Sequence, residues 1–399
     1  MRLRIFCCFV ALCFIIPLNV MGASSVVTRL QNAINTSDTL LLKGKYRLDE
    51  TIRITKPIVI RGKACLVFNK NNEVGISIES SNVTIAGLTV KTKSTQSNVI
   101  QAKGTGEKPL CDLRIENCTV RGGKNAIYWD YVDDAIITSN KIRSVGYAGI
   151  ALHSCHRIDV TFNHIKDINL DHSYQNSYGV AATFHYGRPK STDIRINDNT
   201  VENNPYWEAL DTHGGERIEF CRNVVRNCWR GVAAVSNNHN GVIMLCRDVL
   251  ISNNDIECSD EPYSNGIAFA SEDAEHLSFE WKVNDNIIRN AVIGIYSTYS
   301  SGATVTNNDI AALDEGWQDW GSRNISFVGN KIELAAKAKG NYEKCGIFLI
   351  PKGKANGAFG EIKNNIINSG VSEGIKMRNS FTYSIEQSGN QIDESNHKR

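Results

Sequence analysis

An aspartate and a histidine stand two residues apart in the middle of the chain, at Asp211 and His213. Residues two apart in a β-strand point to the same face of the sheet. Histidine titrates near neutral pH, and a neighbouring carboxylate can orient an imidazole or hold its proton. The pair could therefore transfer protons, provided that neighbouring strands bring further polar groups to the same face.

A repeat in the sequence predicts those neighbouring strands. A unit of Asn, one variable residue, then Ile or Val recurs ten times, and four of its nine intervals are 22 to 24 residues long. Alternating stretches precede the units, and others begin with Gly and an aliphatic residue, as at Gly149-Ile150. Two or three strands per unit without a helix pattern predict a parallel β-helix in which stacked Asn side chains form a ladder. The predicted ladder comprises Asn140, Asn163, Asn199, Asn223, Asn254, Asn286, Asn308, Asn330, Asn365 and Asn390, with Leu88 and Cys118 at the same position in earlier rungs.

The start of the chain predicts a cap and a leader. Apolar residues at helical spacing between Val26 and Ile34 indicate an amphipathic helix that closes the first rung, within a cap of residues 23–60. Residues 1–22 have the charged, apolar, small order of a signal peptide, with Arg2 and Arg4 before the apolar run. We therefore expect a signal peptide at 1–22 and one all-β domain at 23–399, a single-stranded right-handed parallel β-helix of roughly a dozen rungs, on the order of 60 Å long.

Composition and cysteine content narrow the function classes. The 44 Lys and Arg nearly balance the 42 Asp and Glu, which argues against a nucleic-acid binder. No stretch after residue 22 is long and apolar enough to span a bilayer. Nine cysteines remain after residue 22, an odd number without zinc-site spacing, so we expect most to be buried apolar residues and no more than one or two disulfides. They are Cys65, Cys111, Cys118, Cys155, Cys221, Cys228, Cys246, Cys258 and Cys345.

Stacking the rungs predicts which side chains share the outer surface with Asp211. Aligning Leu210 with the aliphatic residue of the other rungs as inward places small residues beside Asp211 in the outward column. That column is Tyr128, Ala151, Ala181, Asp211, Ala233, Ala268, Tyr296, Phe348 and Lys376. The outward column two residues further along is Asp130, His153, Thr183, His213, Val235, Ala270, Thr298, Ile350 and Arg378, with His185 extending the third strand.

These columns supply the candidate site residues. We expect catalytic roles for His213, Asp211, His153 and His185 on an alanine-floored groove. Inserts that bring His172, Tyr174 and basic residues would form its walls. Glu208, three positions from Asp211, is expected on the opposite strand face. The expected substrate-binding residues are Arg230, Arg188, Lys190, Tyr128, Asp130, Tyr206, Trp207 and Tyr296.

The repeat resembles that of the pectate-lyase-like right-handed β-helix superfamily of secreted carbohydrate-active proteins, over nearly the whole mature chain. That superfamily includes lyases, hydrolases, epimerases and phage adhesins, so the resemblance implies the fold and not one reaction. The segment from Glu208 to His213 is similar to the Tyr-Gly-Phe-Asp-Pro-His signature of alginate C5 epimerases. Asp211 and His213 match, whereas Glu208 replaces the Tyr and Thr212 the Pro.

Several reactions stay open at this point. A glycosidase needs two carboxyl groups about 5 to 9.5 Å apart, whereas Asp130 and Asp211 are expected three rungs, or about 14 Å, apart. A lyase needs a cation for the uronate carboxylate, a base and an acid, which the histidines and arginines can supply. We therefore predict a polysaccharide lyase that cleaves an acidic, uronic-acid-containing glycan by β-elimination, with a glycoside hydrolase, a C5 epimerase or a noncatalytic glycan-binding adhesin as alternatives.

The remaining expectations concern partners and location. The predicted partner is a polysaccharide, with no nucleic acid and no integral membrane segment after signal cleavage. The protein is expected to be a monomer, exported to the periplasm or the exterior. No motif specifies a metal or cofactor; calcium is compatible with the superfamily but no ligand set in the sequence indicates it.

Overall fold

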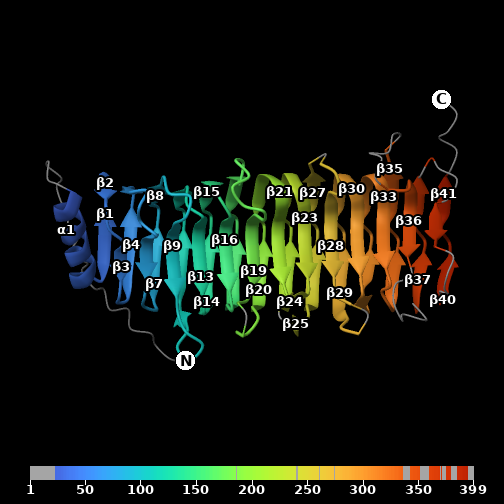
Figure 1. Cartoon of the computed structure of the whole chain (residues 1–399), viewed down its shortest axis with the longest axis horizontal. Coiled ribbons are helices and arrows are strands. Elements are labelled where there is room, and N and C mark those ends of the chain that lie inside the picture. Colours follow the sequence, from blue (N-terminus) through green and yellow to red (C-terminus); the bar gives the residue numbers. More distant parts are fainter. Residues whose placement is uncertain are drawn as a thin grey trace, which may run out of the picture.

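In the computed structural model the chain winds into a long rod of stacked rungs, with one helix at its first end (Figure 1). The structure describes residues 23–185, 187–239, 241–259, 261–273, 275–335, 342–350, 359–368, 370, 374–378 and 384–393. The predicted signal peptide lies outside these residues. The only helix in this part of the chain, α1 (Ala23–Thr36), packs its buried residues Val26, Val27, Leu30 and Ile34 against the first rung, so the predicted cap is confirmed. That helix is not long and apolar enough to cross a membrane.

Each rung contributes strands to three faces, and neighbouring strands on every face are parallel. Face 1 consists of β1 (Thr39–Leu42), β4 (Ile58–Gly62), β7 (Val83–Ala86), β11 (Leu113–Glu116), β14 (Val132–Thr138), β17 (His156–Thr161), β20 (Thr192–Asn197), β22 (Glu216–Cys221), β26 (Arg247–Ser252), β29 (Ser278–Asn284), β32 (Thr304–Thr306), β34 (Ile325–Val328), β37 (Phe359–Lys363) and β40 (Ser384–Ser388). These fourteen strands exceed the predicted dozen rungs.

Faces 2 and 3 share four long strands that run around a corner. Face 2 consists of β2 (Lys45–Leu48), β5 (Cys65–Phe68), β8 (Thr89–Thr92), β12 (Thr119–Arg121), β15 (Lys141–Val145), β18 (His164–Ile168), β21 (Thr200–His213), β23 (Val224–Val235), β27 (Asp255–Cys258), β30 (Ile287–Thr298), β33 (Asp309–Trp320), β35 (Lys331–Leu334), β38 (Ile366–Asn368) and β41 (Gln391–Asp393). Face 3 consists of β3 (Ile52–Ile54), β6 (Val74–Ile78), β9 (Asn98–Lys103), β13 (Asn125–Asp130), β16 (Ala148–His153), β19 (Tyr178–Thr183), β28 (Asn265–Ala270), β36 (Cys345–Ile350) and β39 (Ile375–Met377), with the second halves of β21, β23, β30 and β33. The short strands β10 (Leu110–Cys111) and β31 (Ser300–Ser301) extend face 1. Between β23 and β26, β24 (Asn237–His239) and β25 (Val242–Met244) form an antiparallel pair.

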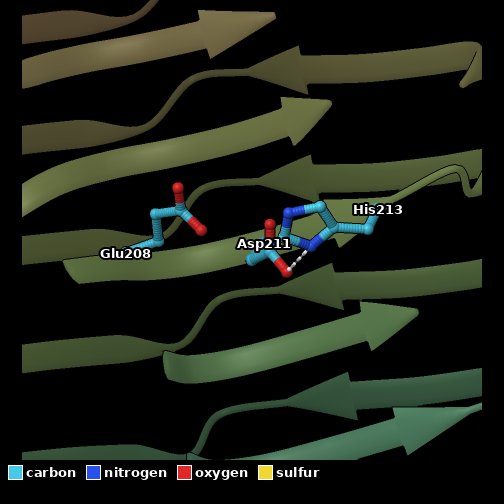
Figure 2. A group of neighbouring side chains, drawn as sticks. All are labelled: Glu208, Asp211 and His213. Carbon is cyan, nitrogen blue, oxygen red and sulfur yellow. Dashed lines mark hydrogen bonds and ion pairs between the residues drawn. The ribbon is translucent and has the colours of Figure 1, made fainter. Parts of the chain in front are cut away.

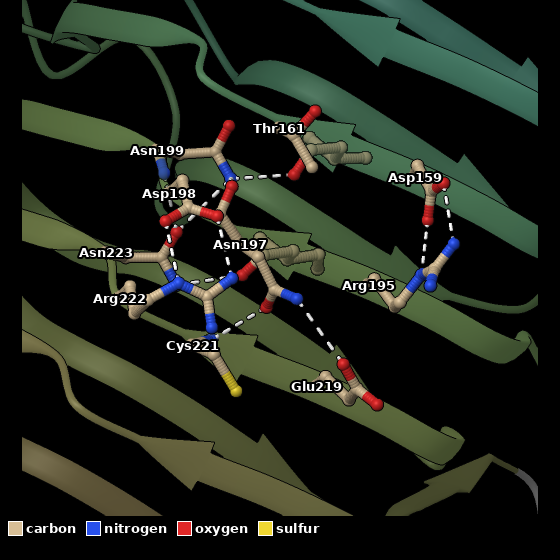
Figure 3. Close-up of polar contacts among 12 residues, drawn as sticks. Asp159, Thr161, Arg195, Asn197, Asp198, Asn199, Glu219, Cys221, Arg222 and Asn223 are labelled. Atoms are coloured by element: carbon tan, nitrogen blue, oxygen red, sulfur yellow. Dashed lines mark hydrogen bonds and ion pairs between the residues drawn. The ribbon is translucent and has the colours of Figure 1, made fainter. Parts of the chain in front are cut away.

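The predicted asparagine ladder is present along its whole length. The side-chain amide of each ladder residue donates to the amide oxygen of the next, as from Asn199 to Asn223 at 3.2 Å (Figure 3). The same contact joins Asn254 to Asn286 at 2.9 Å. All nine links from Asn140 to Asn390 are made. Each amide also forms hydrogen bonds with buried backbone groups. The ladder therefore satisfies the hydrogen-bonding groups of the backbone at the corner between faces 1 and 2.

The ladder accompanies a backbone conformation that most side chains avoid. The residue before every ladder Asn has φ between 55° and 69°, in the left-handed region. These residues are Ser139, Phe162, Asp198, Arg222, Asn253, Asp285, Asn307, Gly329, Asn364 and Gly389. Most are small, Asn or Asp, as this conformation prefers. Asp198 and Arg222 pair across adjacent rungs at 2.8 Å in this corner, whereas the ion pair of Asp159 and Arg195 lies on the strands of face 1 (Figure 3).

All nine cysteines after residue 22 are free thiols, and seven of them are buried. The interpretation of most as small apolar core residues is therefore confirmed. Cys118 also takes the ladder position in its rung, where its backbone N–H donates to Asn140 Oδ1 at 2.9 Å.

We predict that interior ladder residues matter more than the terminal one. Asn254→Ala removes the acceptor of Asn223 N–H and the donor to Phe220 C=O, both buried. It should therefore lower the free energy of unfolding by about 2–4 kcal/mol. Asn390→Ala is the control, because Asn390 is partly exposed and links to one ladder neighbour in the described chain. Urea unfolding of both variants tests this, and equal midpoints would contradict it.

A second prediction concerns Phe162, a bulky residue at φ 56° whose side chain is 63% exposed. Phe162→Asn should stabilise the rod by about 1 kcal/mol, since Asn tolerates this conformation and little buried area is lost. Phe162→Ala should increase the stability less, because Ala is less tolerant than Asn of positive φ. Thermal unfolding measures the difference, and a lower midpoint for Phe162→Asn than for the parent protein would contradict the argument.

Candidate functional site

The candidate residues lie on face 3, in the two outward columns predicted from the sequence. Strand pairing places Tyr128, Ala151, Ala181, Asp211, Ala233, Ala268 and Tyr296 in consecutive rungs, as expected. The second column likewise contains Asp130, His153, Thr183, His213 and Val235 in order. The alignment missed one rung, because β33 carries Gly316-Trp317 where other rungs have Gly and an aliphatic residue. Gln318 and Trp320 therefore stand between Tyr296 and Phe348 and between Thr298 and Ile350.

The expected position of Glu208 was wrong. Ala209 and Leu210 both lie in the hydrophobic core, so strict alternation fails where β21 turns from face 2 to face 3. Glu208 and Asp211, on either side of this inward pair, consequently face outward together. Figure 2 shows Glu208, Asp211 and His213 on the same side of β21, and one ligand atom of each lies within 4.8 Å of the others. The repeated Gly-Ile dipeptide was the available signal, since both of its residues must fit inside the corner.

Glu208, Asp211, His213 and Arg230 form what we call the carboxylate cluster. His213 Nδ1 is 2.9 Å from Asp211 Oδ2, and Arg230 Nη1 donates to Glu208 Oε1 at 2.9 Å. The Asp211 and Glu208 side chains are only 1% and 2% exposed, whereas His213 is 23% exposed. Asp211 is thus buried, although the predicted groove would leave it open to solvent.

The charges of this cluster perturb each other strongly. Burial and the Asp211 carboxylate raise the pKa of Glu208 to about 7, against the opposing effects of His213 and Arg230. Burial alone would lower the pKa of His213, but its interaction with Asp211 and the nearby Glu208 raise that pKa to about 9. His213 is therefore a cation at neutral pH and pairs with Asp211 as Arg230 pairs with Glu208.

The second group, which we call the tyrosine–histidine cluster, consists of Tyr128, Asp130, His153, His185 and Arg188. The Tyr128 hydroxyl is 2.9 Å from His185 Nε2. The His185 ring stacks on His153, with centroids 4.1 Å apart and an interplanar angle of 2°. Arg188 Nη1 donates to both oxygens of Asp130, at 3.0 and 2.7 Å, and Asp130 is buried. His153 lies two strands from His213, about 10 Å along the rod.

Both histidines of this cluster are held neutral. Burial, with His185 and Arg188 next in order, lowers the pKa of His153 to about 3. Burial also lowers the pKa of His185, and Arg188 and Lys103 add to this effect while Asp130 opposes it. Burial raises the pKa of Tyr128 above its usual value, so the phenol keeps its proton.

A tight turn delivers His185 and Arg188 to the cluster. Arg188 N–H donates to His185 C=O at 3.0 Å, and Gly187 has φ +72°, which glycine adopts without strain. Ser154 then binds Pro189 C=O at 2.7 Å and fixes the end of the insert.

The other predicted binding residues are more scattered. Lys190 points to face 1, where it pairs with Glu216 at 2.7 Å, and does not join either cluster. Tyr206 stacks on His172 with centroids 4.0 Å apart, and Trp207 lies 5.1 Å from Trp229. Arg230 sits over the rings of Trp207 and Trp229, at 5.1 and 4.7 Å. Tyr296 lies three rungs beyond Asp211.

Sequence reasoning missed two lysines. Lys103 stands in the column of Asp130, one rung earlier, and was overlooked because the alignment began at Tyr128. Lys124 lies over the rings of Tyr147 and Tyr174, at 5.2 and 5.7 Å, and Tyr174 comes from a predicted insert. Neither lysine has an ion-pair partner among the described residues.

Two surface hollows, of about 520 and 560 Å³, lie elsewhere. The first is lined in part by Lys91 and Arg121, and the second by Asp159 and Arg217 of face 1. Neither contains a residue of the two clusters. We place the candidate site at the clusters, because perturbed titratable groups in contact define the chemistry there.

Comparison with known proteins agrees with the fold. The family described as right-handed β-helix region matches residues 98–245, which include both clusters. The chain is therefore a right-handed parallel β-helix, and the predicted fold class is confirmed. No curated protein matches the chain.

Solved structures extend this similarity over most of the chain. The catalytic unit of a GH87 α-1,3-glucanase from Streptomyces thermodiastaticus matches at 13% identity and a TM-score of 0.67, covering 93% of this chain and 66% of that one. A GH87 α-1,3-glucanase catalytic domain in complex with nigerose matches at 14% identity and a TM-score of 0.60, covering 95% and 68%. A tailspike variant from Escherichia coli bacteriophage HK620, in complex with a pentasaccharide, matches at 12% identity and a TM-score of 0.50, covering 91% and 75%. The chain thus spans just under two thirds of the first glucanase chain, and these identities establish the fold alone.

Buried Glu315 provides a test of how burial on face 3 changes the pKa of a carboxyl group. It lies in the Glu208 column, and burial raises its pKa to about 8. A raised pKa in the folded state means that stability is fully present below about pH 4.5 and is lost as pH rises toward 8. Glu315→Gln, which cannot ionise, should therefore gain stability over the parent protein as the pH rises through this range, by a few kcal/mol.

Urea unfolding at about pH 5 and about pH 9 measures the gain. The exposed Glu333→Gln variant is the control and should show the same difference from the parent at both pH values. A Glu315→Gln difference that does not change with pH would show that this carboxyl ionises freely in the folded rod.

Proposed function

We propose that the protein is a polysaccharide lyase that cleaves an acidic glycan by β-elimination at the tyrosine–histidine cluster. The observation that carries the proposal is the 2.9 Å contact between the Tyr128 hydroxyl and His185 Nε2 on an outward column of the rod. Both side chains are partly exposed, so a glycan lying along face 3 can reach them. The phenol carries a proton and the imidazole lacks one, which is the pairing of acid and base that elimination requires.

The proposed reaction uses each group once. Neutral His185 takes the proton from C5 of a uronate, and the electron pair of the C5–H bond forms the C4=C5 double bond. The C4–O4 bond breaks, and Tyr128 donates its proton to the departing O4. The proton on His185 then returns to the Tyr128 oxygen through their hydrogen bond, which restores both groups. A compact pair on one side of the sugar suits removal of the proton and the leaving group from the same face.

The surroundings of the pair support an anionic substrate. Lys103 and Lys124 flank the cluster without ion-pair partners in the described chain, and Arg188 adds a third cation. Cations neutralise the uronate carboxylate, which lowers the cost of forming a carbanion at C5. His153, stacked on His185, positions its ring.

The structure of the carboxylate cluster argues against the glycosidase alternative. Glu208 and Asp211 are close enough for a carboxylate pair, but their side chains are almost fully buried, so a sugar cannot touch either. The roles predicted for Asp211 and His213 in proton transfer stay predictions. The names of the structural neighbours, an α-1,3-glucanase and a tailspike bound to a pentasaccharide, support a glycan as the substrate class.

The proposal includes the expected location. Residues 1–22 support export to the periplasm or the exterior, where polysaccharides are found. We propose that the exported chain acts as a monomer.

A panel of acidic polysaccharides tests the reaction. We expect one of them to yield an unsaturated uronate, detected by its ultraviolet absorbance, together with new reducing ends. New reducing ends without that absorbance would identify a hydrolase. Binding without cleavage on any member of the panel would identify an adhesin, and either result would overturn the lyase proposal.

Variants of the pair test the residues. His185→Ala and Tyr128→Phe should each reduce kcat at least 100-fold on the substrate found, since general acid–base groups contribute about 10²–10⁴-fold. Arg195→Ala, on face 1, is the matched control and should retain parental activity. If either His185→Ala or Tyr128→Phe kept kcat within a few-fold of the parent, the acid–base pair would lie elsewhere on the rod.

The pH profile provides an independent readout. The acid limb of kcat/KM should lie below pH 6.5, because the pKa of His185 is lowered. Arg188→Ala removes a cation that lowers this pKa and leaves Asp130 unpaired beside the ring, so the limb should move to higher pH. An acid limb that does not move would exclude His185 as the titrating base.

A further inference from the structure

The carboxylate cluster leaves one atom of each of its three central residues free. Glu208 Oε1 binds Arg230, and Asp211 Oδ2 binds His213 Nδ1. The other oxygens, Glu208 Oε2 and Asp211 Oδ1, are buried and accept no hydrogen bond from any described residue. A buried carboxylate oxygen without a partner lowers the stability of the fold. These two oxygens therefore lack a hydrogen-bond donor or a cation.

The three side chains point toward one another. Figure 2 shows the free oxygen of Asp211 and the second ring nitrogen of His213 on the side that faces Glu208. One ligand atom from each residue lies within 4.8 Å of the others. A central ion at metal–ligand distances of about 2.0–2.2 Å fits among three atoms at this spacing after small side-chain movements.

We propose that Glu208, Asp211 and His213 bind a divalent transition-metal ion, and the donor set points to Zn²⁺. Two carboxylate oxygens and one imidazole nitrogen are ligands that Zn²⁺ accepts, and three protein ligands leave a fourth position for water. The all-oxygen set that Ca²⁺ and Mg²⁺ prefer is absent from these three residues.

The surrounding contacts would hold the ligands in place. Arg230 fixes the Glu208 carboxylate, and Arg230 is itself packed against Trp207 and Trp229. The contact between His213 Nδ1 and Asp211 orients the ring so that Nε2 is the nitrogen left for an ion. Because His213 is a cation at neutral pH without an ion, Zn²⁺ binding would displace the proton on Nε2. Among the three proposed ligands His213 alone is partly exposed, so an ion would enter from its side.

This site is separate from the proposed acid–base pair, because Tyr128 lies three rungs from Asp211 and His185 Nε2 contacts Tyr128 and not the carboxylate cluster. Metal binding is measured without substrate, so its failure leaves the lyase proposal untouched. Conversely, an inactive protein can still bind the ion.

Equilibrium dialysis of the full mature chain tests the proposal. The protein is stripped with a chelator and dialysed against Zn²⁺, Mn²⁺ or Ca²⁺, and the bound metal is measured by mass spectrometry. We expect one equivalent of Zn²⁺ per chain and a higher thermal midpoint with Zn²⁺ than with chelator. Binding of Ca²⁺ in preference to Zn²⁺, or no saturable Zn²⁺ binding, would overturn the proposal.

Variants assign the ion to the cluster. Asp211→Asn and His213→Gln should each weaken Zn²⁺ binding at least tenfold. His213→Gln is the safer variant, because its side chain is partly exposed and its loss disturbs the core least. Circular dichroism in chelator establishes that each variant is folded.

Two controls separate this cluster from other carboxylates and histidines. Glu315→Gln changes a buried carboxyl in the same column, and His164→Gln removes an exposed histidine that contacts Glu202. Both should bind one equivalent of Zn²⁺ with parental affinity. If His213→Gln also retained that affinity, the ion would bind elsewhere and the assignment would be wrong.

Discussion

The amide ladder at the corner between faces 1 and 2 is the interaction on which the rest of the rod depends. A left-handed residue turns the chain there in every rung from Ser139 onward, and such a turn removes backbone groups from the strand ladders. The following Asn compensates, because its amide binds both the neighbouring Asn and a backbone carbonyl, as Asn223 does with Asn254 and Ile196. Since each amide needs the next one in line, the ladder also fixes the register of one rung on another.

That register explains how distant residues meet on face 3. His153 and His185 stack although a whole insert separates the rungs that carry them, because the strands before them are aligned residue by residue. Loops of different length leave the corner with the ladder unchanged. The inserts can therefore carry the variable parts, such as Arg188 and Tyr174, while the strands hold the fixed ones.

The sequence was sufficient for the fold because the fold is periodic. The ten asparagines, the helical cap and the outward columns follow from short-range patterns that repeat many times, so local ambiguity averages out. Glu208 was misplaced because a strict alternation was applied across a corner where Ala209 and Leu210 both face the core. The contacts between side chains could not be predicted from the sequence, for another reason. The turn that carries Arg188 to Asp130, and the salt bridge that takes Lys190 to face 1, depend on loop conformation, which has no period. The pairing of Tyr128 with His185 needed the same loop to be placed.

The ladder also allows the length of the rod to change by whole rungs. Between Asn286, Asn308 and Asn330 the rungs are 22 residues long and carry no insert, and each amide meets the next through the same contacts. Duplication or loss of one such unit would rejoin equivalent surfaces and leave the ladder continuous. Evolution can thus lengthen or shorten the rod by whole rungs on either side of the two clusters. The length of face 3 can then change without any change in the residues of the two clusters.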